Sequence, residues 1–223
     1  HDNLLQEGIH DWMHFLGTSR LEWACLLTDI QRAVRRYVNP NFTISFDCAS
    51  PFLATANGQV YHTNQFEDGG KWSYRMGPSA DDKKYATDTR TWRDGLLADI
   101  HLKDPNSPIK NWQDTPISDM LTMKDICIYA PGHLNKNGKE GKTSWDSFTY
   151  ALLMSHNVWM HIDAVQEANR QYDLKVIPNM MQFETPQDRY YFRDIVDRIF
   201  ETDDKDQAEK IIEDYNRYWL EII

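Results

Sequence analysis

The chain has 223 residues, a formal net charge of −10, 41% hydrophobic residues and 13% aromatic residues. This length suits one large domain or two small ones, and the composition is sufficient for a hydrophobic core. No apolar run approaches the roughly 18 residues of a transmembrane helix, so we expect no membrane partner. The acidic balance is unusual for a protein that binds phosphates, although overall charge constrains a local groove poorly.

Three cysteines are present, and their spacing is unlike that of metal ligands: Cys25, Cys48 and Cys127. An odd, unpatterned set of cysteines predicts reduced thiols and therefore a cytoplasmic location.

The N-terminal part predicts a strand, a helix and a second strand. After a first strand near residues 13–19, Ser19 and Glu22 have the spacing of a capping box. Apolar residues then recur at helical spacing as far as Asn39-Pro40, which ends the helix: Trp23, Leu26, Leu27, Ile30, Val34 and Tyr37. A second short strand follows at Thr43–Phe46, with Asp47 at its carboxyl end.

The middle of the chain is rich in turn residues. Asn57-Gly58, flanked by Thr55 and Val60-Tyr61, predicts a β-hairpin, and a further strand is expected over residues 71–75. Residues 76–143 indicate loops and short helices, with a strand expected at 126–129 and a loop at 136–142.

From Ser144 the sequence becomes helical. The first helix is expected to reach about Tyr172, and its buried stripe is expected to comprise Phe148, Leu152, His156, Trp159, Ile162, Val165 and Ala168. Pro186 can open a second helix that continues through Ile199. A third helix is expected over residues 206–222.

Two segments resemble the tRNA-guanine transglycosylase superfamily. The family's nucleophile segment reads roughly FDCVxPTRxxRNG, and this chain matches it without a gap at Phe46, Asp47, Cys48, Pro51, Asn57 and Gly58. Residues 13–19 are similar to the family's HYLMGVG strand, in which the Met-Gly pair lines the base pocket. The resemblance implies that Asp47 is a covalent nucleophile and that Leu16 and Gly17 bind the base.

The resemblance also implies a fold. We expect an α/β protein comprising the last two strands of a (β/α)8 TIM-type barrel, followed by a mixed, mainly helical C-terminal region. The expected division is 1–63 for the barrel units with the nucleophile, 64–143 for a loop-rich insertion and 144–223 for the helical region. The missing N-terminal half of the barrel, which carries the family's acid/base residue, would be another chain or another segment, so this chain alone should be inactive.

Departures from the family point to a particular substrate. Phe52-Leu53 replaces the family's Thr-Arg, and Ala56 replaces its next Arg. Those arginines serve tRNA recognition, and the family's Cys-x-Cys-x-x-Cys zinc motif is also missing, so we expect no metal and no cofactor. The pattern is similar to the DNA-guanine transglycosylases of phages and bacterial DNA-modification clusters, which implies DNA and a free 7-deazaguanine base as partners, in the host cytoplasm if the protein is viral.

Several alternatives remain open. Asp47 can simply cap a turn after a strand. The chain can be a tRNA-guanine transglycosylase with degenerate RNA contacts, a non-catalytic partner subunit, or a nucleoside or glycoside hydrolase in which water resolves the intermediate. Cys48 should point to the opposite face from Asp47 as a small buried residue. His156 and His161 lie five residues apart, which is not the spacing of a two-histidine metal motif.

Overall fold

The computed structural model describes residues 1–2, 4–80, 82–95, 115–131, 146–184 and 189–222. The protein is α/β, with three two-stranded sheets and no closed barrel among these described residues. The chain forms two compact units that are interleaved along the sequence. The first unit comprises His1–Ala49, Phe66–Ser73 and Val165–Ile223, and the second comprises Ser50–Gln65 and Tyr74–Ala164.

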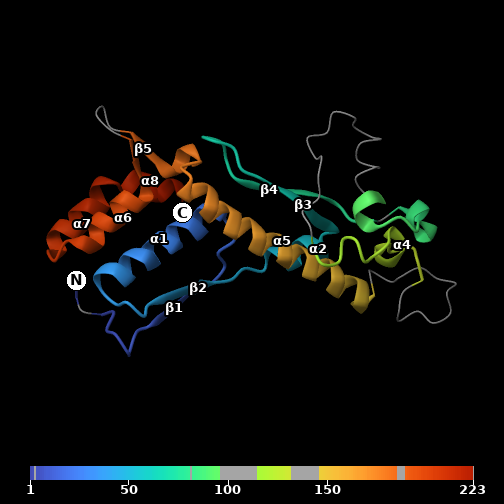
Figure 1. Cartoon of the computed structure of the whole chain (residues 1–223), viewed down its shortest axis with the longest axis horizontal. Helices are drawn as coiled ribbons and strands as arrows, with labels where there is room; N and C mark the ends of the chain where they lie inside the picture. The colour runs from blue at the N-terminus through green and yellow to red at the C-terminus, as the bar shows by residue number, and fades with distance from the viewer. Residues whose placement is uncertain (3, 81, 96–114, 132–145, 185–188, 223) are drawn as a thin grey trace. The chain divides into compact units, whose positions relative to one another are not determined.

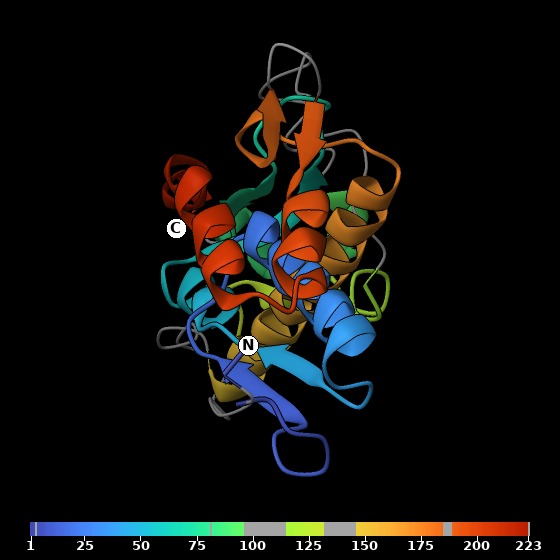
Figure 2. The same cartoon turned by 90° about the vertical axis from the view of Figure 1, so that its left-hand side faces the viewer.

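The first unit begins with a β-α-β motif. Strands β1 (Trp12–Phe15) and β2 (Thr43–Phe46) are parallel, side by side, and joined through α1 (Leu21–Tyr37) (Figures 1 and 2). Their register pairs His14 with Ser45 and Phe15 with Phe46. The expected helix and second strand are thereby confirmed, and the first strand ends at Phe15, just before Leu16-Gly17.

The rest of the first unit is mainly helical. It contains the end of α5 (Ser147–Asp173), a 3-10 turn (Asn179–Met181), the antiparallel pair β5 (Gln182–Glu184) and β6 (Arg189–Tyr191), then α6 (Phe192–Glu201), α7 (Lys205–Asp214) and α8 (Asn216–Ile222). Helix α1 packs against α6 (Figure 1). The buried faces of these two helices are apolar and include Leu21, Ala24, Leu27, Phe192, Ile195 and Val196.

A charged cluster links α1 to α6 and to the end of α5. The side chain of Asp29 is only 1% exposed, and the Arg193 guanidinium donates to it over 3.1 Å. Arg193 and Arg32 both donate to Asp173, at 2.5 and 3.1 Å. Burial raises the pKa of Asp29, and the facing Arg193 opposes this rise. Arg193 therefore compensates a carboxylate that has lost its water.

The second unit contains α2 (Ser50–Ala56), β3 (Gln59–Gln65), β4 (Ser73–Pro78), a 3-10 turn (Lys83–Thr87), α4 (Met123–Ile126) and the start of α5. Ser73 itself is assigned to the first unit. The main core cluster comprises Val60, Ala80, Tyr85, Trp92, Met123, Ile126, Cys127, Ala130 and Leu153. Asn157 connects α5 to α2 and β3. Its side-chain amide accepts from the Tyr61 amide and donates to Pro51 O, Thr55 Oγ1 and Gln59 O.

Among the described residues of the second unit, three histidines are buried, and His62 and His156 are buried most deeply. The Nε2 atom of His156 is 2.7 Å from the Tyr61 carbonyl oxygen, and its Nδ1 atom is 3.0 Å from Thr115 Oγ1. Burial lowers the pKa of His156 from 6.5 to about 4. Burial, together with the neighbouring His156, also lowers the pKa of His62 to about 4. Both rings are therefore neutral at pH 7.

Three expectations about turns and short elements are wrong. The capping box at Ser19 and Glu22 does not form, because Arg20 is the N-cap residue and Glu22 falls one position too early. Asn57-Gly58 ends helix α2 rather than turning a hairpin, with Gly58 at a positive φ of 71° that suits a helix C-terminus. The strand expected at 126–129 is absent. Residues 123–126 form helix α4 instead, because Thr122 and Asp125 make a reciprocal capping box there.

Expectations for the C-terminal helices are partly wrong. Helix α5 is present, and the predicted stripe is right in part: His156 and Ala168 are buried, whereas Phe148, Trp159 and Ile162 are exposed. The buried face also contains Leu153, Met160 and Ala164, which were not predicted. Residues 189–191 form strand β6, so the next helix begins only at Phe192, and the last helix is divided in two at Tyr215. The expected strand near 71–75 is present as β4. Pro186 and the loop at 136–142 lie outside the described residues, and the segment limits at 63 and 143 stay predictions.

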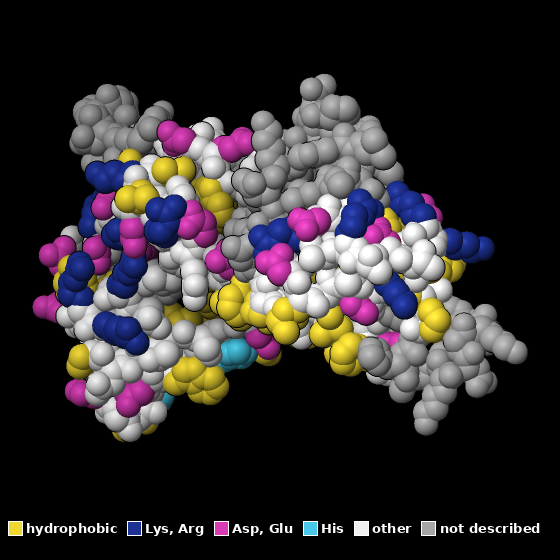
Figure 3. All heavy atoms as spheres, turned by 45° about the vertical axis from the view of Figure 1, so that its right-hand side comes forward, with side chains coloured by type: hydrophobic (Ala, Val, Ile, Leu, Met, Phe, Trp, Pro, Cys, Tyr) yellow, Lys and Arg dark blue, Asp and Glu magenta, His cyan; other side chains and the backbone are white. Residues whose placement is uncertain are grey.

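The surface carries charge of both signs. Lys, Arg, Asp and Glu side chains are interspersed on the face drawn in Figure 3, and hydrophobic side chains reach the surface in patches between them. Among the described residues, none of the helices has both the length and the apolar character needed to cross a bilayer.

The charged cluster makes a first testable prediction. Replacing Arg193 by Met should lower the free energy of unfolding by about 3 kcal/mol, because Asp29 would stay buried without its main cation. Arg36→Met is the matched control, since Arg36 joins the same two helices by an exposed pair with Asp197 at 3.0 Å. The control should cost less than about 1 kcal/mol. Urea titrations followed by circular dichroism measure both, and equal losses would contradict this account.

The buried histidines make a second prediction, on pH. The pKa values of His62 and His156 fall from 6.5 to about 4 on folding. Their contribution to stability is therefore fully present above pH 6.5. That stability is lost as the pH falls from 6.5 through 4, with a slope of at most about 1.4 kcal/mol per pH unit for each histidine. Urea midpoints measured between pH 7 and pH 5 should therefore decrease, and His156→Gln should reduce the slope. A midpoint that does not change with pH would refute the assignment.

Candidate active site at the end of strand β2

Asp47 follows the last residue of β2, at the same sheet edge as the end of β1. Its backbone amide donates to Phe15 O over 3.3 Å, and its carbonyl oxygen accepts from the Thr18 amide over 2.7 Å. These two bonds fix the Asp47 backbone against the turn that leaves β1. The side chain is 61% exposed, so the carboxylate is accessible from solvent.

Gly17 faces the Asp47 carboxylate. Its amide nitrogen lies 3.4 Å from Asp47 Oδ1, and its φ of 75° is in the left-handed region that favours glycine. This conformation directs the amide of the turn toward the end of β2. The predicted pair of Gly17 and Asp47 is thus brought together, although the two residues are thirty positions apart in the sequence.

A histidine lies on the other side of the carboxylate. The Nε2 atom of His14 is 3.7 Å from Asp47 Oδ2, a distance at which a protonated imidazole forms an ion pair. The Nδ1 atom of His14 is 2.8 Å from Ser45 Oγ, and the Trp12 indole N–H donates to the same oxygen over 2.9 Å. Trp12, Ser45 and His14 therefore form a hydrogen-bonded chain that ends beside Asp47.

Strand alternation explains why these side chains meet. Successive side chains of a strand point to opposite faces, so Trp12 and His14 share a face with Ser45 on the register-paired strand. The opposite face carries the apolar positions Met13, Phe15, Ile44 and Phe46. The polar alternation was visible in the sequence, but its meaning required the parallel register, and His14, Ser45 and Trp12 were missed.

The other predicted residues are placed as follows. Leu16 adjoins Gly17 in the turn and is 80% exposed, and its role in binding a base stays a prediction. Cys48 is half-buried rather than buried, and none of the three cysteines forms a disulfide. Phe52 and Leu53 both lie on α2 and are exposed.

No metal centre is formed by the described residues. Nowhere among them do three or more His, Cys, Asp or Glu side chains converge as ligands. The Nδ1 atom of His161 is 2.8 Å from the Tyr74 hydroxyl, and the two rings stack with centroids 5.3 Å apart. His161 therefore has a packing role on α5.

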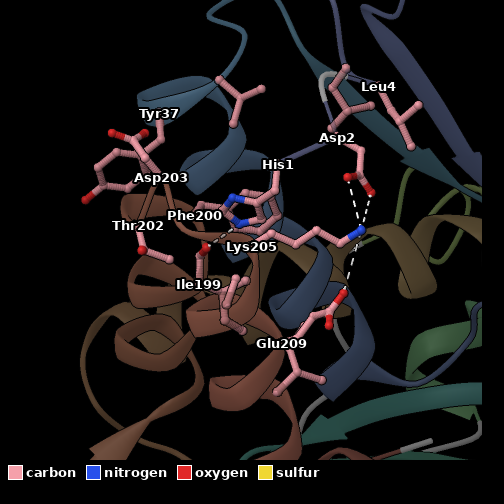
Figure 4. A pocket seen from close by; sticks show the side chains of 14 residues that line it. His1, Asp2, Leu4, Tyr37, Ile199, Phe200, Thr202, Asp203, Lys205 and Glu209 are labelled. Atoms are coloured by element: carbon pink, nitrogen blue, oxygen red, sulfur yellow. Dashed lines mark hydrogen bonds and ion pairs between the residues drawn. The ribbon is translucent and has the colours of Figure 1, made fainter.

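Two of the hollows on the units lie away from Asp47. One of about 490 Å³ in the first unit is partly filled by the N-terminal residues, where Lys205 pairs with Asp2 and the His1 ring bonds Ile199 O over 3.0 Å (Figure 4). The other, of about 420 Å³ in the second unit, has an uncharged lining: Phe52, Ala151, Met154, Ser155, Val158, Trp159 and Ile162. Neither contains Asp47 or His14.

Comparison with known proteins adds no relative. No protein-family model, curated protein or solved structure matches this chain. Its function must therefore be argued from the motif and the geometry around Asp47.

Proposed function

We propose that this chain is the C-terminal portion of a guanine transglycosylase that replaces guanine in DNA by a 7-deazaguanine. The observation that carries the proposal is the position of Asp47. It lies at the carboxyl end of a parallel strand, accessible to solvent, with the Gly17 amide 3.4 Å from its carboxylate. The family resemblance places the nucleophile and the base pocket at these same two residues.

The proposed chemistry is a double displacement. An Asp47 oxygen attacks C1′ of the nucleotide, the bond from C1′ to guanine N9 breaks, and guanine leaves with the electron pair and takes up a proton. The incoming 7-deazaguanine then attacks C1′, loses a proton and releases the Asp47 carboxylate. Two inversions give net retention, and no cofactor is needed.

We further propose that β1, α1 and β2 are the last repeat of a (β/α)8 barrel. Catalytic groups of such barrels lie at the carboxyl ends of the strands, where Asp47 lies. Parallel sheets are normally covered on both faces and continued by further strands. Among the described residues β1 and β2 pair only with each other, and the apolar side chains of Trp12 and Met13 are exposed. These features support completion of the sheet by an N-terminal barrel half, as a separate chain or another segment.

The choice of DNA over tRNA rests on α2. This helix carries no basic residue, and its exposed positions Phe52 and Leu53 replace the family's tRNA-contacting Thr-Arg. A base in duplex DNA would have to be flipped out or met in a single strand to reach the site.

Base exchange provides the direct test. The chain together with its N-terminal barrel half is offered labelled 7-deazaguanine with DNA or tRNA. Label should enter DNA and not tRNA, and Asp47→Asn should reduce incorporation at least about a thousandfold without unfolding the protein, because the nucleophile is lost. Label in tRNA alone would favour the tRNA enzyme, and no label with a folded protein would favour a non-catalytic subunit or a hydrolase.

Gly17 allows a sharper test of the site geometry. Gly17 and Gly8 have nearly the same φ, 75° and 76°, and an added Cβ meets no atom within 4 Å at either position. Alanine at either position should therefore cost about 1 kcal/mol of stability from backbone strain alone. Only Gly17→Ala should also lower base exchange, since only Gly17 faces Asp47. Equal activity of the two variants would remove Gly17 from the site.

A further inference from the structure

The hydrogen bonds of Trp12 and Ser45 determine how the His14 ring is oriented beside Asp47. An indole N–H can donate but not accept, so Trp12 fixes Ser45 Oγ as its acceptor. A hydroxyl has one proton and two lone pairs, so Ser45 can still donate to a neutral His14 or accept from a protonated one. Ser45 therefore supports the same ring orientation in both protonation states of His14.

This arrangement also determines which nitrogen of His14 faces Asp47. With Nδ1 on Ser45 at 2.8 Å, Nε2 is directed to Asp47 Oδ2 at 3.7 Å. A bare Nε2 lone pair would repel the carboxylate, so neutral His14 should carry its proton on Nε2. When His14 is protonated, its charge lies beside Asp47 and favours the ionised carboxylate.

We infer that His14 is a positioning residue whose charge controls how readily Asp47 is released from the sugar. The inference rests on the proposed function. The free carboxylate is negative, whereas the Asp47–sugar ester is neutral, so a positive His14 stabilises only the free state. Protonated His14 thus shifts the equilibrium from the covalent intermediate toward free enzyme and intact nucleotide.

The effect should be moderate, because both side chains are partly exposed to solvent, 30% for His14 and 61% for Asp47. Loss of the His14 charge should increase the covalent fraction by about twofold to fivefold, the range that exposed ion pairs provide. His14→Gln should increase the covalent fraction by a similar factor. Ser45→Ala should increase it by a smaller factor, because the His14 ring would lose the hydrogen bond that orients it.

The experiment measures the covalent DNA–protein fraction on denaturing gels, with the barrel completed, at a fixed concentration of guanine. The leaving guanine takes up a proton, so the covalent fraction of every variant depends on pH, and variants are compared at the same pH. His14→Gln should form about twofold to fivefold more covalent adduct than the wild-type protein wherever His14 carries its charge. His10→Gln, an exposed histidine of the same segment, is the matched control and should behave as the wild type.

The outcomes separate the two proposals. A covalent fraction that is the same in His14→Gln and wild type at every pH would overturn the role of His14 and leave the proposed function intact. No adduct in the wild type would overturn the proposed function and this inference with it. Nitrogen-15 spectra of the histidines give a readout without catalysis: neutral His14 should be protonated at Nε2, and protonation at Nδ1 would contradict the inference.

Discussion

The candidate site depends on the parallel pairing of β1 and β2. Two parallel strands joined by a helix have their carboxyl ends at the same edge, so the turn after Phe15 and the residue after Phe46 must meet. That constraint brings the Gly17 amide to one oxygen of Asp47 and the His14 imidazole to the other. A slip of one residue would turn His14 and Ser45 to opposite faces and dismantle the site.

The pairing in turn depends on how α1 is held. Helix α1 buries an apolar face against α6, and the buried Asp29 is compensated by Arg193 from that helix. The Gln31 side chain of α1 also accepts from the Ile44 amide over 2.6 Å, which connects the helix directly to β2. Helix α1 therefore connects the charged cluster to the strand that precedes Asp47.

The local elements that carry strong patterns were predictable, and those that depend on tertiary partners were not. The helix over 21–37 and the strand 43–46 follow from apolar spacing and from Pro40. These are local patterns that can be recognised without knowing which elements pack against them. The Asn57-Gly58 dipeptide suits both a hairpin and a helix end, and here it ends a helix whose Pro51 and Ala54 are buried. On α5, aromatic residues occur on several faces, so the sequence could not reveal that Trp159 is exposed and Met160 buried.

The site was predictable in part. Asp47 and Gly17 came from motif resemblance, whereas His14 and Ser45 became visible only when the register placed them side by side. Trp12 and His14 are two residues apart, but this spacing alone does not predict a site. Their contact with Ser45 follows only from the register of the two strands.

The most direct measurement is the identity of the residue that is bound to the sugar. The chain is combined with the N-terminal half that we propose, trapped with DNA and digested with protease and nuclease, and the peptides are sequenced by tandem mass spectrometry. This account predicts a deoxyribose remnant on the carboxylate of Asp47. A remnant on any other residue, or a trapped complex without a covalent bond, would contradict it.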